Sequence, residues 1–243
     1  MMTATPAPAA AETESRRAAA LLDAQRKAAL LFEEIATQGL IRPGARESQI
    51  SKEIYQLSRS KFNAGRHWHK RVIRTGVNTV YPYQAEPEDR VVAADDIVYV
   101  DLGPVFQEWE ADFGRTYVLG EDARKHALCA ELPKVFAAGK KRFQDNADIT
   151  GAELYHFVSG LAEHLGWVFG NDHAGHLVGE FPHEKIHGDR ISLYIHPDNT
   201  APLRSLDVLG LKRHWILEVH LVDRDRRYGA FYEDLLTLGG LPA

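Results

Sequence analysis

The sequence contains very little cysteine and no excess of positive charge. Cys129 is the single cysteine among 243 residues, so the chain cannot form an internal disulfide or a multi-cysteine zinc or iron–sulfur site. Lys and Arg number 29 against 34 Asp and Glu, which gives a net charge of −5 and no general cationic field for a phosphate backbone. Nucleic acid is therefore not an expected partner. Any bound metal must be held by His, Asp and Glu.

The sequence also lacks an apolar run long enough to cross a bilayer. Residues 1–14 are rich in Ala, Pro and Thr, without the basic start and apolar stretch of a secretory signal. We therefore expect no membrane contact and a cytoplasmic location. Residues 1–14 are predicted to form a disordered tail, followed by a single domain over residues 15–243.

Helical and strand-like segments occur in clusters along the chain. Apolar spacing predicts helices over 16–39, after Gly44, over 122–144 with a kink or break at Pro133, and from a capping box at Thr150 to Gly166. Short β-branched and aromatic segments predict strands at 71–73, 97–102, 117–119, 191–195, 215–222 and 231–238. Because helices and strands do not alternate strictly, we expect an α+β domain with a largely antiparallel sheet.

Acidic residues stand within or beside several predicted strands. Asp101 lies near the end of the apolar strand 97–102, and Asp112 follows eleven residues later. Glu218 and Glu233 lie within the last two strands. A carboxylate buried without a partner is costly, so these residues require partners. Taken singly, Asp101 and Asp112 are better explained as a turn aspartate, a helix cap or a salt bridge to Arg115, and Glu218 and Glu233 as ordinary surface glutamates.

Histidines are concentrated between residues 173 and 187. His173 and His176 have the spacing H-x-x-H. On a strand these two positions would point to opposite faces, so we expect only one of them to face a given site.

The order of these motifs resembles the pita-bread metallopeptidases, which include aminopeptidase P, prolidase, methionine aminopeptidase and creatinase. The pattern comprises an Asp in V-D-L-G, an Asp before R-T, G-H-x-x-G-x-x-x-H-E, a strand Glu and a final E-D-x-x-T, over roughly residues 15–240. The resemblance implies a pita-bread fold with pseudo-two-fold halves. Its curved, mainly antiparallel sheet would be flanked by helices and would hold two divalent metal ions.

The resemblance also implies a set of metal ligands, namely Asp101, Asp112, His176, Glu218 and Glu233. Asp101 would bind one ion, His176 and Glu218 would bind the other, and Asp112 and Glu233 would bridge both. Four carboxylates balance the charge of two divalent ions. An oxygen-rich set with one imidazole suits Mn, Co, Fe or Zn.

Two further positions have implied catalytic roles. His183 corresponds to the family histidine that steadies the substrate carbonyl or the tetrahedral intermediate. Tyr83 stands five residues after Asn78, where the family has an upstream histidine. A phenol there can donate a hydrogen bond, but it is a poor acid–base group near neutrality.

Other departures from the family pattern concern specificity and access. Phe231 stands two positions before Glu233, where proline-specific members usually have arginine. His67, His69 and Arg71 are interpreted as the solvated polar end of a strand, with compensation for the missing histidine as the alternative. The separate N-terminal domain usual in prolidase, aminopeptidase P and creatinase has no counterpart before residue 15, so the site is expected to be either more open or closed by a second subunit in a homodimer.

The function implied by the resemblance is a dinuclear metal-dependent hydrolase. It would cleave a small amide or the N-terminal bond of a short peptide, Xaa-Pro peptides included. Three alternatives remain open: a methionine-aminopeptidase-like activity, a non-peptide metabolic enzyme as creatinase illustrates, and a binding module without turnover.

Overall fold

The computed structural model describes residues 8–182 and 190–239. The first half of the chain forms α1 (Pro8–Thr37), α2 (Glu47–Phe62), β1 (Val72–Thr75), the 3-10 turn η1 (Gly76–Val80), β2 (Ile97–Leu102), β3 (Val105–Phe106), β4 (Trp109–Glu110) and β5 (Phe113–Val118). The second half forms α3 (Ala123–Asp145), α4 (Gly151–His164), β6 (Val168–Phe169), β7 (Leu177–Val178), the 3-10 turn η3 (Arg190–Leu193), β8 (His214–Val222) and β9 (Gly229–Leu235).

Seven of the described strands form one sheet in the order β1-β2-β5-β9-β8-β6, with β7 also paired to β8. Every one of these pairings is antiparallel, as the sequence predicts. The register aligns Asp101 with Gly114, Gly114 with Glu233, and Glu233 with Glu218. Three carboxylates from three strands therefore lie in one row across the sheet.

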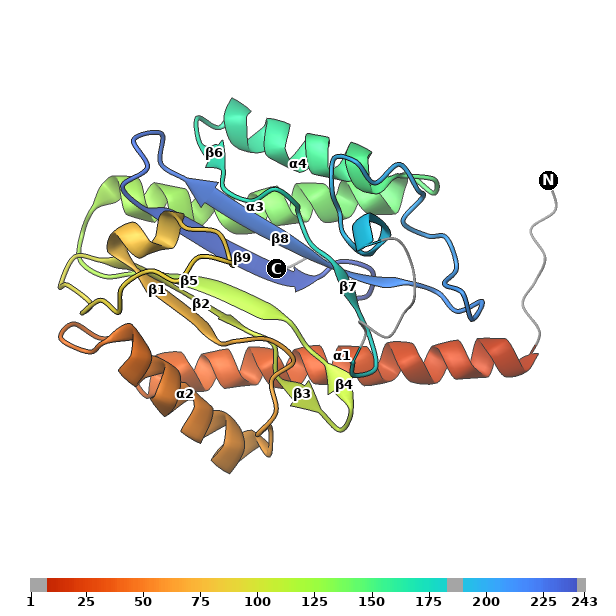
Figure 1. Ribbon diagram of the computed structural model, residues 1–243, viewed down its shortest axis with the longest axis horizontal. Coiled ribbons are helices and arrows are strands. Elements are labelled where there is room, and N and C mark those ends of the chain that lie inside the picture. The colour runs from red at the N-terminus through yellow and green to blue at the C-terminus, as the bar shows by residue number, and fades with distance from the viewer. Residues whose placement is uncertain (1–7, 183–189, 240–243) are drawn as a thin grey trace.

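The two faces of this sheet have different neighbours because side chains alternate along each strand. Val98 and Val100 of β2 pack in a core with α1 and α2, whereas Asp101 belongs to the opposite face. On β8, Leu217 and Val219 pack in a second core with α3 and α4. These core residues all point away from the face of Asp101 and Glu218, so both helix pairs pack on the same face of the sheet. In the view of Figure 1, α3 and α4 lie above the strands and α1 and α2 below them. The opposite face is left for a site.

The helices follow the sequence signals with two differences. The capping box of α4 is present, with Thr150 and Glu153 each bonding the other's backbone amide. Pro133 lies inside α3, which remains a single helix from Ala123 to Asp145. Helix α1 begins at Pro8, so residues 8–14 form its first turns and are not part of a disordered tail.

The predicted strand at 191–195 is wrong. Residues Arg190–Leu193 form the 3-10 turn η3, and the short apolar run is packed against the core through Ile195 and Leu193. The apolar residues of this segment are explained by their burial in the core and not by a strand. No helix in the described part of the chain is both long enough and apolar enough to span a membrane.

Candidate metal centre

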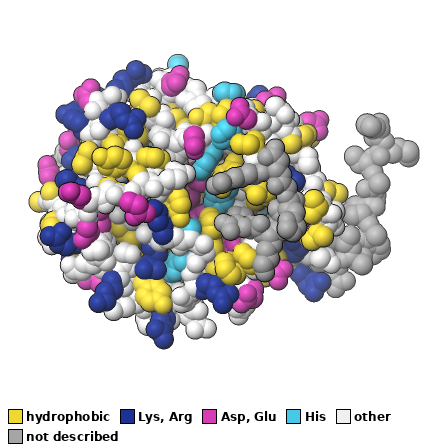
Figure 2. Space-filling view, in the orientation of Figure 1, with side chains coloured by type: hydrophobic (Ala, Val, Ile, Leu, Met, Phe, Trp, Pro, Cys, Tyr) yellow, Lys and Arg dark blue, Asp and Glu magenta, His cyan; other side chains and the backbone are white. Residues whose placement is uncertain are grey.

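A cavity of about 310 Å³ opens on the face of the sheet that the helices leave uncovered. Its wall contains the row formed by Asp101, Glu233 and Glu218, called here the acidic row, together with Asp112, histidines, an asparagine and aromatic rings. Figure 2 shows histidine and acidic side chains gathered around a hollow near the centre of this face. The residues that line it are Trp68, His69, Val72, Tyr81, Tyr83, Gln84, Tyr99, Asp101, Asp112, Asn171, His173, His176, Tyr194, Glu218, His220, Phe231 and Glu233.

All four carboxylates predicted as metal ligands line this cavity and are almost fully buried. Asp101 is 8% exposed, Asp112 2%, Glu218 6% and Glu233 2%. Oδ1 of Asp101 and Oε1 of Glu233 have no hydrogen-bond partner among the described residues. Buried carboxylate oxygens without partners are costly, and a divalent cation would satisfy them. The donor set therefore fits the ions that the sequence predicts.

Gly114 separates the two ends of the acidic row. A side chain there would come within 2.7 Å of the Phe231 ring and 3.1 Å of Cγ of Glu233. The glycine therefore leaves the space that Glu233 and Phe231 occupy on the cavity face.

His176 joins the acidic row from the segment before β7. Its Nε2 lies 2.9 Å from Oδ2 of Asp112 and 3.6 Å from Oε1 of Glu218. Its Nδ1 lies 2.7 Å from the carbonyl oxygen of Leu177, which can only accept a hydrogen bond, so Nδ1 donates. The structure thus brings together all five predicted ligand residues.

The expectation that only one of His173 and His176 faces the site is wrong. Both line the cavity, and Nδ1 of His173 lies 3.8 Å from Oε2 of Glu218. The two-residue alternation of a strand does not apply because β7 begins only at Leu177 and Gly175 has a φ of +131°. A side chain on Gly175 would also come within 2.1 Å of the carbonyl oxygen of Ile216.

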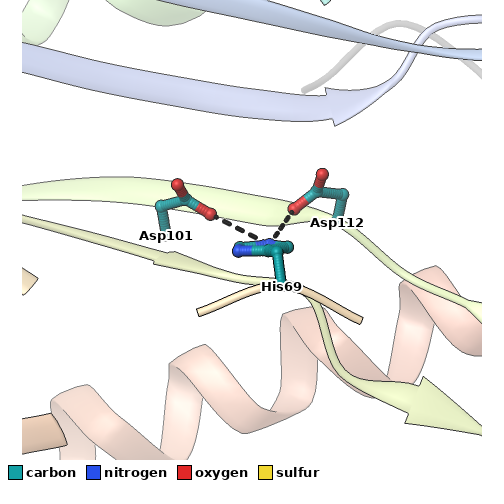
Figure 3. Close-up of side chains that lie close together, drawn as sticks. All are labelled: His69, Asp101 and Asp112. Carbon is teal, nitrogen blue, oxygen red and sulfur yellow. Dashed lines mark hydrogen bonds and ion pairs between the residues drawn. The ribbon is translucent and has the colours of Figure 1, made fainter. Parts of the chain in front are cut away.

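His69 belongs to the site, and its interpretation as a solvated strand end is wrong. Its side chain is 7% exposed, and its Nε2 lies 3.1 Å from Oδ1 of Asp112 and 3.4 Å from Oδ1 of Asp101. Figure 3 shows the imidazole pointing to both carboxylates at once. These three residues form a candidate metal-binding group.

Backbone pairing holds the segment that carries His69. The amide of Trp68 donates to the carbonyl of Gly103, and the amide of Val105 donates to the carbonyl of Arg66. A Cβ on Gly103 would come within 2.2 Å of the His69 ring and 2.4 Å of the Trp68 indole nitrogen. The glycine of the V-D-L-G motif therefore makes room for His69 beside Asp101.

The electrostatics of the site follow from burial and from like charges in contact. Burial and the neighbouring carboxylates Asp112 and Glu218 raise the pKa of Asp101 to about 7, despite the opposing effect of His69. Burial, together with Asp101 and Asp112, raises the pKa of Glu233 well above its usual range. Without a cation, this cluster holds protons near neutral pH that a metal ion would displace.

The two imidazoles next to Asp112 also have raised pKa values, but here burial opposes the shift and the neighbouring carboxylates cause it. Burial lowers the pKa of a histidine, but attraction to Asp101 and Asp112 outweighs it and raises the pKa of His69 to about 9. Burial likewise opposes the charge on His176, yet its hydrogen bond to Asp112 and the nearby Glu218 raise its pKa to about 9. In the absence of metal, both rings offset part of the negative charge of the row.

Tyr83 lies at the mouth of the cavity and is 40% exposed. Burial raises the pKa of its phenol, so the group stays protonated near neutral pH and can donate a hydrogen bond. Arg74, which is buried, donates to the carbonyls of Pro82 and Ala85 at 2.9 Å each. The Arg74 guanidinium therefore fixes the backbone on both sides of Tyr83.

His183, the other predicted catalytic residue, lies outside the described residues. Several cavity residues were not predicted from the sequence, among them Asn171, His220 and Tyr99. Asn171 contacts both Glu218, at 3.3 Å, and His220, at 3.1 Å. His220 could have been found, because it stands two residues after Glu218 on β8 and must therefore share its face.

The chain belongs to metallopeptidase family M24, whose family model matches residues 19–238. A Xaa-Pro dipeptidase of Pyrococcus horikoshii is 26% identical over 146 residues, which cover 59% of this chain and 40% of that protein. A methionine aminopeptidase of Clostridium acetobutylicum is 26% identical over 113 residues, covering 46% of this chain and 44% of that protein. The matched region spans less than half the length of these relatives.

Solved structures show the same fold. A prolidase of Thermococcus sibiricus superposes with a TM-score of 0.70 at 19% identity, covering 95% of this chain and 57% of that one. A methionine aminopeptidase of Thermotoga maritima superposes with a TM-score of 0.66 at 18% identity, covering 98% of this chain and 100% of that one. The predicted pita-bread fold, with a mainly antiparallel sheet flanked by helices, is confirmed.

Proposed function

We propose that the protein is a metal-dependent hydrolase that cleaves a small amide or the N-terminal bond of a short peptide. Two divalent ions would be held by Asp101, Asp112, His176, Glu218 and Glu233. The observation that carries this proposal is the buried acidic row, which lines a cavity of about 310 Å³ and in which Oδ1 of Asp101 and Oε1 of Glu233 have no hydrogen-bond partner among the described residues. A cavity of that size accepts a small substrate.

The ligand residues have distinct tasks. Asp112 presents one oxygen toward His69 and the other toward His176, so it can bridge two ions. Glu233 lies in the row between Asp101 and Glu218 and can do the same. Two divalent ions held by these residues would supply Lewis acidity and an acidified water, which amide hydrolysis requires.

The remaining cavity residues would bind and orient the substrate. Tyr83 is positioned by Arg74 and can donate a hydrogen bond from its phenol to a substrate oxygen or nitrogen. Val72, Tyr99 and Phe231 form a small apolar cluster that also lines the cavity. We therefore propose an apolar substrate side chain next to the Asp101 end of the row.

Proline specificity is a narrower proposal. The Pyrococcus horikoshii relative is a Xaa-Pro dipeptidase, which supports Xaa-Pro peptides as first substrates to test. Phe231 supplies an apolar ring where proline-specific members of the family usually have arginine. A proline ring is apolar and would suit this wall, whereas a substrate carboxylate would lack that arginine as its partner.

The test is to remove bound metal from the protein, add back Mn, Co, Fe or Zn, and measure hydrolysis of candidate substrates. The substrates would be Xaa-Pro dipeptides and tripeptides, peptides with N-terminal Met, and simple amides. We expect metal-dependent cleavage of at least one class, and Glu218→Gln should abolish it. Two bound metals without cleavage of any of these substrates would contradict the peptidase proposal and favour a non-peptide substrate.

A further inference from the structure

His69 and His176 are placed equivalently on the two sides of Asp112. Nε2 of His69 lies 3.1 Å from Oδ1 of Asp112, and Nε2 of His176 lies 2.9 Å from Oδ2. The rings come from segments more than a hundred residues apart, and the Trp68 indole contacts both, with ring centroids 4.4 Å from His69 and 5.0 Å from His176. The metal-ligand set inferred from the sequence contains only His176.

The hydrogen bonds of both rings set the same tautomer. Nδ1 of His69 lies 2.6 Å from the carbonyl oxygen of Lys70, and Nδ1 of His176 lies 2.7 Å from that of Leu177. A carbonyl only accepts, so each Nδ1 carries its proton. In the neutral ring, Nε2 then presents a lone pair, which is the arrangement found in metal-binding histidines.

The distances around His69 fit ligands that share an ion. Metal–ligand bonds of about 2.1 Å place two ligand atoms about 3.0 Å apart at right angles and about 3.4 Å apart in a tetrahedron. The observed separations from Nε2 of His69 are 3.1 Å to Asp112 and 3.4 Å to Asp101. In addition, Oδ1 of Asp101, the atom nearer to His69, has no hydrogen-bond partner among the described residues.

We propose that His69 is a metal ligand through Nε2, completing with Asp101 and Asp112 the half of the centre that is opposite His176. This inference rests on the proposed metal centre and adds a ligand to it. Each half of the site then has one imidazole. Carboxylate oxygens alone suit Mn, whereas an imidazole nitrogen favours metals such as Zn, Fe and Co. A His69 ligand would therefore shift the metal preference of this half of the centre away from Mn.

The test is calorimetric titration of metal-free native protein and of His69→Gln with Co and with Mn. We expect two sites in the native protein. In His69→Gln, one site should weaken at least about tenfold for Co and less for Mn, while the other keeps its affinity. The visible absorption of the cobalt-loaded protein should change with the loss of one nitrogen ligand, which gives a readout independent of turnover.

His67→Gln is the matched control on the same segment. His67 lies two residues upstream, outside the residues that line the cavity, so its replacement should leave both affinities and the cobalt spectrum unchanged. Thermal unfolding of the metal-free variants checks that each is folded. An equal loss in both variants would mean that the segment, and not the His69 ring, determines affinity, and would overturn the inference.

Three other outcomes are decisive. Two full-affinity sites in folded His69→Gln would overturn the inference and leave the proposed function intact. One site in the native protein, with a second gained in His69→Gln, would mean that the protonated ring takes the place of an ion, and would also overturn it. No metal binding by the native protein would overturn both the inference and the proposed metal centre.

Discussion

Glu218 and Glu233 are direct cross-strand partners on β8 and β9, and both face the cavity. Like charges in such a pair destabilise a sheet, so this pairing is kept at a cost that a cation can offset. We expect Glu233→Gln to make the metal-free protein more stable above neutral pH, because it removes one buried charge. The same variant should lose at least about tenfold in metal affinity. Urea unfolding with and without metal measures both effects.

Glu131→Gln is a suitable control for that experiment. Glu131 lies on α3 away from the cavity and forms an exposed ion pair with Lys134 three residues away. Its replacement should change neither metal affinity nor the pH dependence of unfolding. If Glu233→Gln behaved like this control, Glu233 would not belong to the metal centre.

The stability of the metal-free protein should fall as pH rises. The pKa of Asp101 is raised to about 7, and those of His69 and His176 to about 9. A group with a raised pKa in the folded state binds protons more tightly there, so its contribution is full at low pH and is lost as pH rises through the raised value. We expect a loss of more than about 1 kcal/mol between pH 5 and pH 9.

Metal affinity should have the opposite pH dependence. Divalent ions compete with the same protons, so affinity should rise as pH passes through about 7, where Asp101 releases its proton. The increase in melting temperature on adding metal should therefore grow from pH 6 to pH 8. A pH-independent increase would contradict the assignment of Asp101 as a ligand.

Gly103→Ala should damage the site without replacing any of the residues that hold the metal. Its new methyl group would overlap the His69 ring, which lies 2.2 Å from the Cβ position. We expect weaker metal binding and a loss of stability of about 1–3 kcal/mol. Gly179→Ala is the control, because Gly179 has open space around its Cβ position and no positive φ, so metal binding should not change.

Tyr83→His tests whether the phenol is suited to another reaction. If the site is a conventional aminopeptidase, histidine should leave kcat/KM on Xaa-Pro peptides equal or higher. If the scaffold serves a less charged ligand, the change should impair the true reaction without creating peptidase activity. Tyr83→Phe separates the hydroxyl from the ring: removing one hydrogen-bond donor to the transition state should lower the rate on the order of 100-fold.

Because side chains along a strand point alternately to the two faces of the sheet, much of the fold was predictable from the sequence. The apolar strand 97–102 was predicted with the bounds that β2 has in the structure, and Asp101 faces the cavity as its position requires. The 3-10 turn at Arg190–Leu193 was mistaken for a strand because short buried runs have similar compositions in both. Sequence pattern therefore identified the sheet but not every short apolar segment.

The same limit applies to the site. The role of His69 was not predictable, because its burial depends on backbone pairing between residues 66–68 and 103–105, which no local pattern specifies. Likewise, His173 and His176 both face the cavity only because Gly175 takes a backbone conformation that a strand excludes. His183 stays a prediction, and His183→Ala should retain metal while losing activity on the order of 100-fold if its implied role is correct.

The most direct test of the central claim is anomalous diffraction from crystals of the manganese-loaded protein. The account predicts two anomalous peaks in the cavity, one in contact with Asp101 and one with His176 and Glu218, both in contact with Asp112 and Glu233. Asp112→Ala crystals prepared in the same way should lose at least one peak. No peak at the acidic row, or two undiminished peaks in Asp112→Ala, would contradict the account.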